Sequence, residues 1–334
     1  MKAIALISGG LDSILAARII QEQGIEVIPL HFKIPFCHRL KNAAFAGDKV
    51  ASLVKQALSL PLRTVDIGAE FLPLLERPRH GFGSGSNPCI DCKVLMARVA
   101  AQMMAEWGAS FVITGEVLGQ RPMSQHRRAL RVIEEESGLG DLLLRPLSAR
   151  RLPETFPERQ GWVLRKRLLD FCGRGRRPQM ELAERFMISG YPNAAGGCLL
   201  TDKVFSRRIR DLIAHRQLSI PNTELLKAGR HFRLNSELKL VVGRDQEENA
   251  FLESLAQPED HLFYPPEDIA GPTALARGIM DEMSIRLCCS IVCKYCDASG
   301  LPEKKIIYRK TEWQQSAALT VAAAEDSLLK GLAV

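Results

Sequence analysis

The stretch Ser8-Gly9-Gly10-Leu11-Asp12-Ser13 follows the first apolar run of the chain and decides how the fold begins. The run before it, Ala3 to Ile7, is short and apolar, which predicts a buried parallel strand. After it, apolar residues recur at helical spacing until Gly24, which predicts a helix. A Gly-Gly turn between a strand and a helix directs free backbone N–H groups and the positive end of the helix dipole at one point. The stretch therefore predicts a binding site for a phosphate or pyrophosphate.

The same six residues resemble the SGGxDS signature of the PP-loop ATP pyrophosphatase superfamily, whose members cleave ATP between the α- and β-phosphates and adenylate a substrate. They form neither a Walker A loop nor a G-x-G-x-x-G fingerprint. The resemblance implies ATP binding by Ser8, Gly9, Gly10, Asp12 and Ser13, with Asp12 also placing Mg²⁺. The plainer alternative is an ordinary strand-to-helix turn, which also favours Gly, Ser and Asp.

Composition limits the classes of protein that this chain can belong to. Its 334 residues are 46% apolar and 25% charged, which predicts a globular protein of about two domains. No apolar run approaches the roughly 20 residues of a membrane span, and the N-terminus does not resemble a signal peptide. We therefore expect a cytoplasmic protein with no membrane partner.

The net charge of +7 is unevenly distributed along the chain. Residues 1–218 contain 32 Lys and Arg against 21 Asp and Glu, whereas residues 219–334 contain 13 against 17. Such an asymmetry is typical of a protein with one half that faces nucleic acid.

Strands and helices alternate after the first unit. Further strands are expected over residues 26–32, 62–67, 111–114 and 142–144, and helices over 43–58 and 94–107. This alternation predicts an α/β fold with a doubly wound parallel sheet of the Rossmann type. His31 and Phe32 end the second strand and Thr114-Gly115-Glu116 ends the fourth, so both ends should lie near Ser8.

A smaller α+β domain is expected to follow. We expect a helix over residues 202–215, a linker at Pro221-Asn222, and a domain boundary that separates residues 1–218 from 219–334. Strands are predicted over 238–242, 261–264 and 305–308, with a helix over 246–256. Val242-Gly243-Arg244-Asp245, followed by Glu247-Glu248-Asn249, is similar to the RNA-binding domain of the NFACT proteins.

Arginines are concentrated in residues 150–190, which we expect to be helical. A solvated helical face is the plain interpretation, but clustering on the basic half favours a patch that contacts a nucleic-acid backbone. The basic residues concerned are Arg121, Arg127, Arg128, Arg131, Arg150, Arg151, Arg165, Lys166, Arg167, Arg174, Arg176, Arg177 and Arg185.

Three of the nine cysteines have spacing that suggests sulfur or metal chemistry. Asn87 is expected to cap a helix that starts at Pro88, which places Cys89 and Cys92 in the first turn, where the helix dipole favours thiolates. Cys198 follows a glycine turn that could bring a third sulfur to the same place. Three thiolates suit a [4Fe–4S] cluster with one open iron, while two of them could instead run a persulfide and disulfide cycle.

The resemblance extends to these cysteines and to the segments between them. Asn-Pro-Cys-x-x-Cys with the distant Gly-Gly-Cys resembles the tRNA 2-thiouridylase pattern, and residues 114–120, 124–125 and 144–147 resemble the PP-loop domain of tRNA 4-thiouridine synthetases. The resemblance implies ATP contacts at Gly115 and Gln125, and an adenine contact at His31-Phe32. It also implies a sulfur-transfer site formed by Cys89, Cys92 and Cys198.

The function that we expect is therefore an ATP-dependent tRNA sulfurtransferase, with tRNA and a sulfur donor (a protein persulfide or sulfide) as partners and a homodimer as one form of assembly. Two alternatives stay open: a PP-loop enzyme that adenylates a small molecule, and a non-catalytic RNA-binding module. A second group, Cys288, Cys289, Cys293 and Cys296, contains a usable zinc half-site. On a strand, however, the first two would point to opposite faces.

Overall fold

The computed structural model describes residues 1–36, 46–191, 198–297, 302–312 and 315–334. The chain forms two compact units, Met1–Thr201 (unit 1) and Asp202–Val334 (unit 2). No helix among the described residues is long and apolar enough to cross a membrane.

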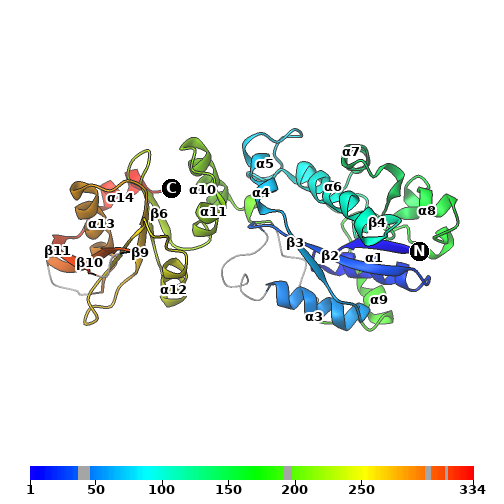
Figure 1. The fold of residues 1–334 in the computed structure, drawn as a ribbon, viewed down its shortest axis with the longest axis horizontal. Helices are drawn as coiled ribbons and strands as arrows, with labels where there is room; N and C mark the ends of the chain where they lie inside the picture. The colour runs from blue at the N-terminus through cyan, green and yellow to red at the C-terminus, as the bar shows by residue number, and fades with distance from the viewer. Residues whose placement is uncertain (37–45, 192–197, 298–301, 313–314) are drawn as a thin grey trace. The chain divides into compact units, whose positions relative to one another are not determined.

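Unit 1 is built on a five-stranded parallel sheet with the order β3-β2-β1-β4-β5 (Figure 1). The order reverses direction at β1, so the ends of β1 and β4 flank the switch point where doubly wound sheets bind ligands. The strands are β1 (Lys2–Leu6), β2 (Glu26–Lys33), β3 (Arg63–Asp66), β4 (Phe111–Thr114) and β5 (Leu143–Leu144).

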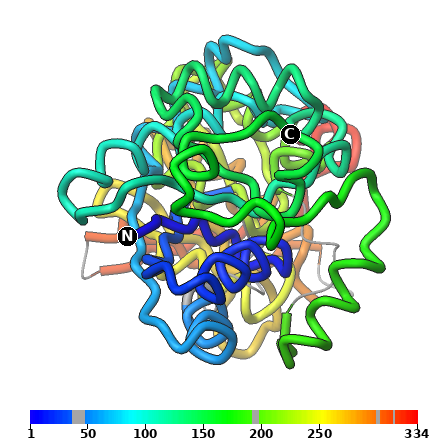
Figure 2. The backbone as a smooth tube through the Cα atoms, turned by 90° about the vertical axis from the view of Figure 1, so that its right-hand side faces the viewer, coloured from blue at the N-terminus to red at the C-terminus, as the bar shows by residue number. Residues whose placement is uncertain are grey.

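Helices cover both faces of this sheet. Helices α1 (Leu11–Gln21), α3 (Ala46–Leu58) and α9 (Arg177–Arg185) pack together on one face, and α6 (Cys89–Trp107) and α7 (Arg127–Ser137) pack together on the other (Figures 1 and 2). Short helical segments complete the unit: α4 (Gly68–Phe71), α5 (Pro73–Glu76), α8 (Phe156–Arg159) and four 3₁₀ turns, Gly140–Leu142, Ala149–Arg151, Arg165–Arg167 and Leu199–Thr201.

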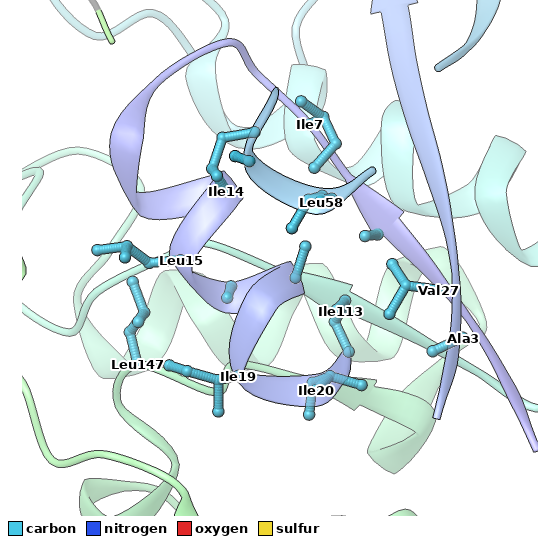
Figure 3. Packing of buried hydrophobic residues seen from close by; sticks show 14 of the residues in the cluster. Ala3, Ile7, Ile14, Leu15, Ile19, Ile20, Val27, Leu58, Ile113 and Leu147 are labelled. Atoms are coloured by element: carbon cyan, nitrogen blue, oxygen red, sulfur yellow. The ribbon is translucent and has the colours of Figure 1, made fainter. Parts of the chain in front are cut away.

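Helix α1 forms the centre of the unit 1 core. Eight of its residues are buried, among them Ile14, Leu15 and Ile20, because its neighbours on the sheet face enclose it on several sides. Figure 3 shows these side chains between the sheet residues Ala3, Val27 and Ile113 and residues from the flanking segments, including Leu58 of α3. Burying each large apolar side chain contributes about 1.5–3 kcal/mol. The helix that starts at the glycine turn is thus fixed firmly in place.

Unit 2 contains a six-stranded antiparallel sheet with the order β11-β10-β8-β9-β7-β6. Its strands are β6 (Arg230–Arg233), β7 (Lys239–Val242), β8 (His261–Tyr264), β9 (Ala274–Arg277), β10 (Glu303–Lys310) and β11 (Ala317–Ala322). Its helices are α10 (Lys203–Ala214), α11 (Ile220–Leu225), α12 (Gln246–Ser254), α13 (Glu282–Lys294) and α14 (Asp326–Leu332).

Helix α10 joins unit 2 through buried ion pairs. Asp211 lies 2.6 Å from Arg233 of β6 and 2.7 Å from Lys239 of β7. Burial alone would raise the pKa of Asp211, but the bonds from Arg233 and Lys239 outweigh it and hold the pKa below its ordinary value. Arg208 also donates to the carbonyl oxygens of Leu226 and Gly229. These contacts place residues 202–218 in unit 2, whereas the sequence analysis assigned them to the first domain.

The structure confirms the α/β architecture and corrects several local expectations. Pro221-Asn222 is not a linker, because both residues lie inside α11. Residues 150–190 are mostly turns and short helical segments rather than helix, since α9 is the one helix there of more than four residues. Helix α13 and strands β6, β9 and β11 were not expected. The first residues of the helix predicted over 43–58 lie outside the described residues.

Candidate active site

The glycine turn, Ser8 to Ser13, is stabilised by hydrogen bonds of its serine hydroxyl groups. The Ser13 hydroxyl donates to the Gly10 carbonyl at 2.8 Å and accepts from the Ser8 N–H at 3.2 Å and the Ser8 hydroxyl at 3.3 Å. Gly9 has φ +80°, and a Cβ there would lie 2.7 Å from Val50 of α3. Gly10 caps α1 without a side-chain bond. The serine hydroxyls thus hold the shape of the turn, and the backbone N–H groups at the start of α1 are the donors for an anion.

Strand β4 ends against the start of α1 at Gly115. A Cβ on Gly115 would lie 2.4 Å from the Ser13 backbone nitrogen and 2.5 Å from the Asp12 carbonyl carbon, so this position admits no side chain. The segment after β4 therefore lies directly beside the glycine turn, as the order of the sheet requires.

Asp12 reaches this same segment. Its Oδ2 accepts a hydrogen bond from Gln120 Nε2 at 2.7 Å. Its Oδ1 is buried and has no hydrogen-bond partner among the described residues. Because a buried carboxylate oxygen without a partner is costly, this oxygen marks where a cation or donor would bind.

Glu116 and Arg145 form a buried ion pair behind the site. Arg145 is 2% exposed and Glu116 is 3% exposed, and Arg145 Nε donates to Glu116 Oε2 at 3.0 Å. Arg145 also bonds Glu134 and the Leu130 carbonyl, which ties the end of β5 to α7. The pair fixes the segment after β4 from the side opposite to α1.

The other residues expected to contact the nucleotide, His31, Phe32 and Gln125, differ in their burial and in their hydrogen-bond partners. His31 is half-buried and its Nδ1 lies 2.8 Å from the Ile7 carbonyl, so Nδ1 must carry the proton that this oxygen accepts. Phe32 is buried on the opposite face of β2. Gln125 is 4% exposed, and its Oε1 lacks a partner within the described part of the chain.

The Cys-x-x-Cys segment forms the first turn of α6. The helix begins at Cys89 rather than at Pro88, and Pro88 is the N-cap in place of Asn87. The Cys92 N–H bonds the Pro88 carbonyl at 2.8 Å, so Cys92 already belongs to the helical ladder. Between the two cysteines, the buried Asp91 carboxylate accepts from the backbone N–H groups of Arg79 at 2.9 Å and His80 at 3.2 Å.

Backbone hydrogen bonds bring the segment of Cys198 toward this turn. The Ser86 N–H donates to the Leu200 carbonyl, and the Leu199 N–H donates to the Phe36 carbonyl, both at 2.9 Å. The backbone two residues after Cys198 is thus bonded to the backbone three residues before Cys89. The glycines before Cys198 lie outside the described residues. In the part of the chain that is described, no three His, Cys, Asp or Glu side chains are grouped as a metal site.

The four C-terminal cysteines lie on or directly after α13 and are buried in the core of unit 2. Burial raises the pKa of Cys289 to about 12 and that of Cys296 to about 11, and raises those of Cys288 and Cys293 as well. These side chains are protonated thiols that fill the core.

Many of the arginines expected in a basic patch have intramolecular partners. Arg150, Arg165 and Arg177 pair with Asp170, Glu158 and Glu181, respectively. Arg121, Arg128, Lys166 and Arg174 are exposed and have no carboxylate partner among the residues that the structure describes. Together with Arg185, which is also exposed and has no carboxylate partner in the described part of the chain, they are available to an external phosphate.

Two residues that the sequence analysis did not select are part of the site. Gln120 is the residue that contacts Asp12, and Gln179 of α9 contacts Gln120. Gln120 lies in the segment 114–120, but the sequence analysis assigned the ATP contact to Gln125. Gln179 had no recognisable signal, because it lies far along the chain in an arginine-rich stretch.

Family models match both units of the chain. Residues 1–150 match the family described as thiamine biosynthesis protein (ThiI), and residues 229–331 match the RNA-binding domain of NFACT proteins. The ThiI match thus covers 150 of the 334 residues, and the NFACT match lies within unit 2. The glycine turn, Gly115 and Arg145 all lie within the residues that match the ThiI family model, which agrees with the resemblance stated from the sequence.

Several curated proteins to which this chain is similar are named tRNA sulfurtransferases. A probable tRNA sulfurtransferase of Thermococcus kodakarensis is 27% identical over 155 residues, which cover 44% of this chain and 36% of the relative. One of Methanosarcina mazei is 33% identical over 127 residues, which cover 36% and 29%. The chain thus spans about a third of the length of these relatives. A solved 4-thiouridine synthetase–RNA complex with bound ATP aligns with 19% identity and a TM-score of 0.39, covering 68% of this chain and 52% of that one.

Proposed function

We propose that this protein is an ATP-dependent tRNA sulfurtransferase, which adenylates a uridine carbonyl oxygen and replaces that oxygen with sulfur. The observation that carries the proposal is the start of α1. Here the glycine turn, backbone N–H groups with no side-chain cap, and an Asp12 Oδ1 without a partner in the described residues converge. The similarity to relatives named tRNA sulfurtransferase supports the substrate class.

In the activation step, the uridine oxygen attacks the α-phosphorus of ATP and pyrophosphate leaves. The N–H groups at the start of α1 would stabilise the charge on the phosphates. Asp12 Oδ1 would hold Mg²⁺, which supplies charge neutralisation when bound. His31 has its Nδ1 engaged with the Ile7 carbonyl, which leaves Nε2 as an acceptor for the adenine amino group. We keep Ser8, Phe32, Gly115 and Gln125 as further proposed contacts of ATP.

In the second step, a nucleophilic sulfur attacks the activated carbon and AMP leaves with the oxygen. We propose that Cys89, Cys92 and Cys198 serve this step. The donor set suits a [4Fe–4S] cluster, which would carry sulfide when bound. Their arrangement among the described residues is not that of a metal site, so no step is derived through the cluster. On the thiols alone, one cysteine would carry a persulfide whose outer sulfur attacks, and a second thiol would then release the product by forming a disulfide.

The tRNA would be bound by both units. Unit 2 matches an RNA-binding domain, and unit 1 offers the exposed cations Arg121, Arg128, Lys166 and Arg174. Contacts of this kind bind the phosphate backbone and weaken as salt concentration rises.

The test is thiolation of a tRNA transcript by the purified protein with ATP, Mg²⁺ and, in parallel reactions, sulfide or a persulfide donor, read by mass spectrometry of the nucleosides. Cys92→Ser should abolish the thiolated nucleoside, whereas Cys172→Ser, at an exposed cysteine outside the proposed site, should not. Thiolation by Cys92→Ser at the wild-type level would refute the sulfur role. Pyrophosphate release in the absence of RNA would instead favour an enzyme that adenylates a small molecule.

Iron and acid-labile sulfide measured on anaerobically purified protein would decide between cluster and persulfide. Cys92→Ser should lose both if the cluster is present. A colourless, iron-free protein with full activity would exclude the cluster while leaving the sulfurtransferase proposal intact.

A further inference from the structure

Asp12 presents two oxygen atoms with different surroundings. Oδ2 accepts from Gln120 Nε2 at 2.7 Å, while Oδ1 is buried without a partner in the described residues. Which oxygen faces a bound cation is therefore decided by the residue that holds the other one.

The chemistry of the carboxylate fixes the orientation of Gln120. A carboxylate only accepts hydrogen bonds, so Gln120 must turn its Nε2 toward Asp12 and its Oε1 away from it. That Oε1 lies 3.1 Å from Gln179 Nε2, which donates to it. The Asp12 carboxylate therefore fixes which atom donates in both hydrogen bonds. Rotating the side-chain amide of either glutamine by 180° would break these hydrogen bonds.

The position of Gln179 is fixed by burial and by the backbone around it. It is 1% exposed, it lies in the first turn of α9, and its remaining Oε1 has no partner among the described residues. The backbone joins the two glutamine segments independently, because the Gly173 N–H donates to the Leu118 carbonyl at 2.7 Å and Leu118 pairs with Cys172 in a parallel bridge. The segment before Gln120 and the segment before α9 are thus fixed side by side.

We propose that Gln179 is a positioning residue for Asp12, acting through Gln120, so that Asp12 Oδ1 is directed at the Mg²⁺ that accompanies ATP. The inference rests on the proposed ATP site and adds a residue more than 160 positions away from Asp12 in the chain. Gln179 touches neither the cation nor the nucleotide. Its effect is to lock the amide that holds the carboxylate, in the manner of outer residues that orient metal ligands.

The experiment measures binding of a non-hydrolysable ATP analogue to the full-length protein by calorimetry, with Mg²⁺ and with EDTA. Gln179→Met keeps the length of the side chain and removes its hydrogen bonds. We expect the Mg²⁺-dependent gain in affinity to fall about 10- to 100-fold in Gln179→Met, with binding in EDTA unchanged. Glu184→Met places the same side chain at an exposed position of α9 and should behave as wild type.

A double-mutant cycle separates a positioning role from a structural one. In a Gln120→Met background, Gln179→Met should cause no further loss, because the residue through which it acts is already gone. Additive losses, or equal losses with Mg²⁺ and with EDTA, would overturn the inference while leaving the ATP site in place. If the wild-type protein binds no nucleotide, the proposed function fails and the inference fails with it.

Discussion

Replacing Arg145 with methionine should destabilise unit 1 more than any surface substitution. Arg145 is 2% exposed and pairs with Glu116, which is 3% exposed. Among the described residues, Glu116 has otherwise only the Thr114 hydroxyl as a donor. Its removal leaves a buried carboxylate without a counter-charge, and breaking such a pair costs about 3–5 kcal/mol. For a unit of this size, each kcal/mol corresponds to roughly 2–4 °C in the melting temperature.

The cost should arise from the stranded charge rather than from lost packing. Arg145→Met combined with Glu116→Gln should therefore recover a large part of the stability, because the neutral amide is cheaper to bury than the carboxylate. Arg131→Met is the control, since Arg131 pairs with Glu135 at the surface and its removal should leave the unfolding midpoint unchanged.

The assay is urea unfolding followed by tryptophan fluorescence. Trp107 and Trp162 lie in unit 1, and Trp162 packs against Phe111 and Phe156. A Trp313→Phe background confines the signal to unit 1, which matters because two units can unfold in separate transitions. The reasoning would be refuted if Arg145→Met lowered the free energy of unfolding of unit 1 by less than about 1 kcal/mol, or if the double variant were as unstable as the single one.

Three further predictions follow from local geometry. Gly115→Ala should abolish binding of an ATP analogue in calorimetry, because the new methyl group would lie 2.4 Å from the Ser13 nitrogen, whereas Gly175→Ala has open space and should bind normally. Asp91→Ala should speed tryptic cleavage after Arg77 and Arg79, because two backbone N–H groups lose their acceptor; an unchanged digestion rate would contradict this. The free energy of unfolding of unit 2, measured by urea titration with circular dichroism, should fall as the pH rises from 9 to 11. The α13 thiols ionise near 9.0 when unfolded, but the pKa values of Cys296 and Cys289 are raised to about 11 and 12 in the folded state. Lys239 and Arg208, whose pKa values are lowered by burial to about 8 and about 10, act in the opposite sense, but they are two groups against four. A rise in stability between pH 9 and 11 would contradict the prediction.

The parallel sheet of unit 1 was predictable because its signals are local. Each strand is a short apolar run, each helix has its own periodicity, and the glycine turn lies between the first pair. In unit 2 the missed elements lack such signals. β9 is four residues long and largely buried, with no alternation of polar and apolar side chains, and α13 was obscured by its cysteines.

The domain assignment and the details of the site depend on contacts that are distant in the chain. Helix α10 belongs to unit 2 because Asp211 meets Arg233 and Lys239, which no property of α10 alone indicates. Likewise, the sequence predicted Asp12, but its partner Gln120 is 108 residues away and could not be distinguished from Gln125. Local patterns identify which residues are chemically suited to a site, whereas tertiary contacts decide how they are oriented.

The buried thiols on and directly after α13 make it possible to measure how often unit 2 opens. Four of the nine cysteines lie in that core with at most 7% exposure, while Cys172 is exposed and Cys89, Cys92 and Cys198 are partly so. A thiol-reactive label should modify the latter group at once and reach α13 only when unit 2 opens. At high label concentration the slow phase then measures the opening rate, and at low concentration it measures the fraction of molecules that are open.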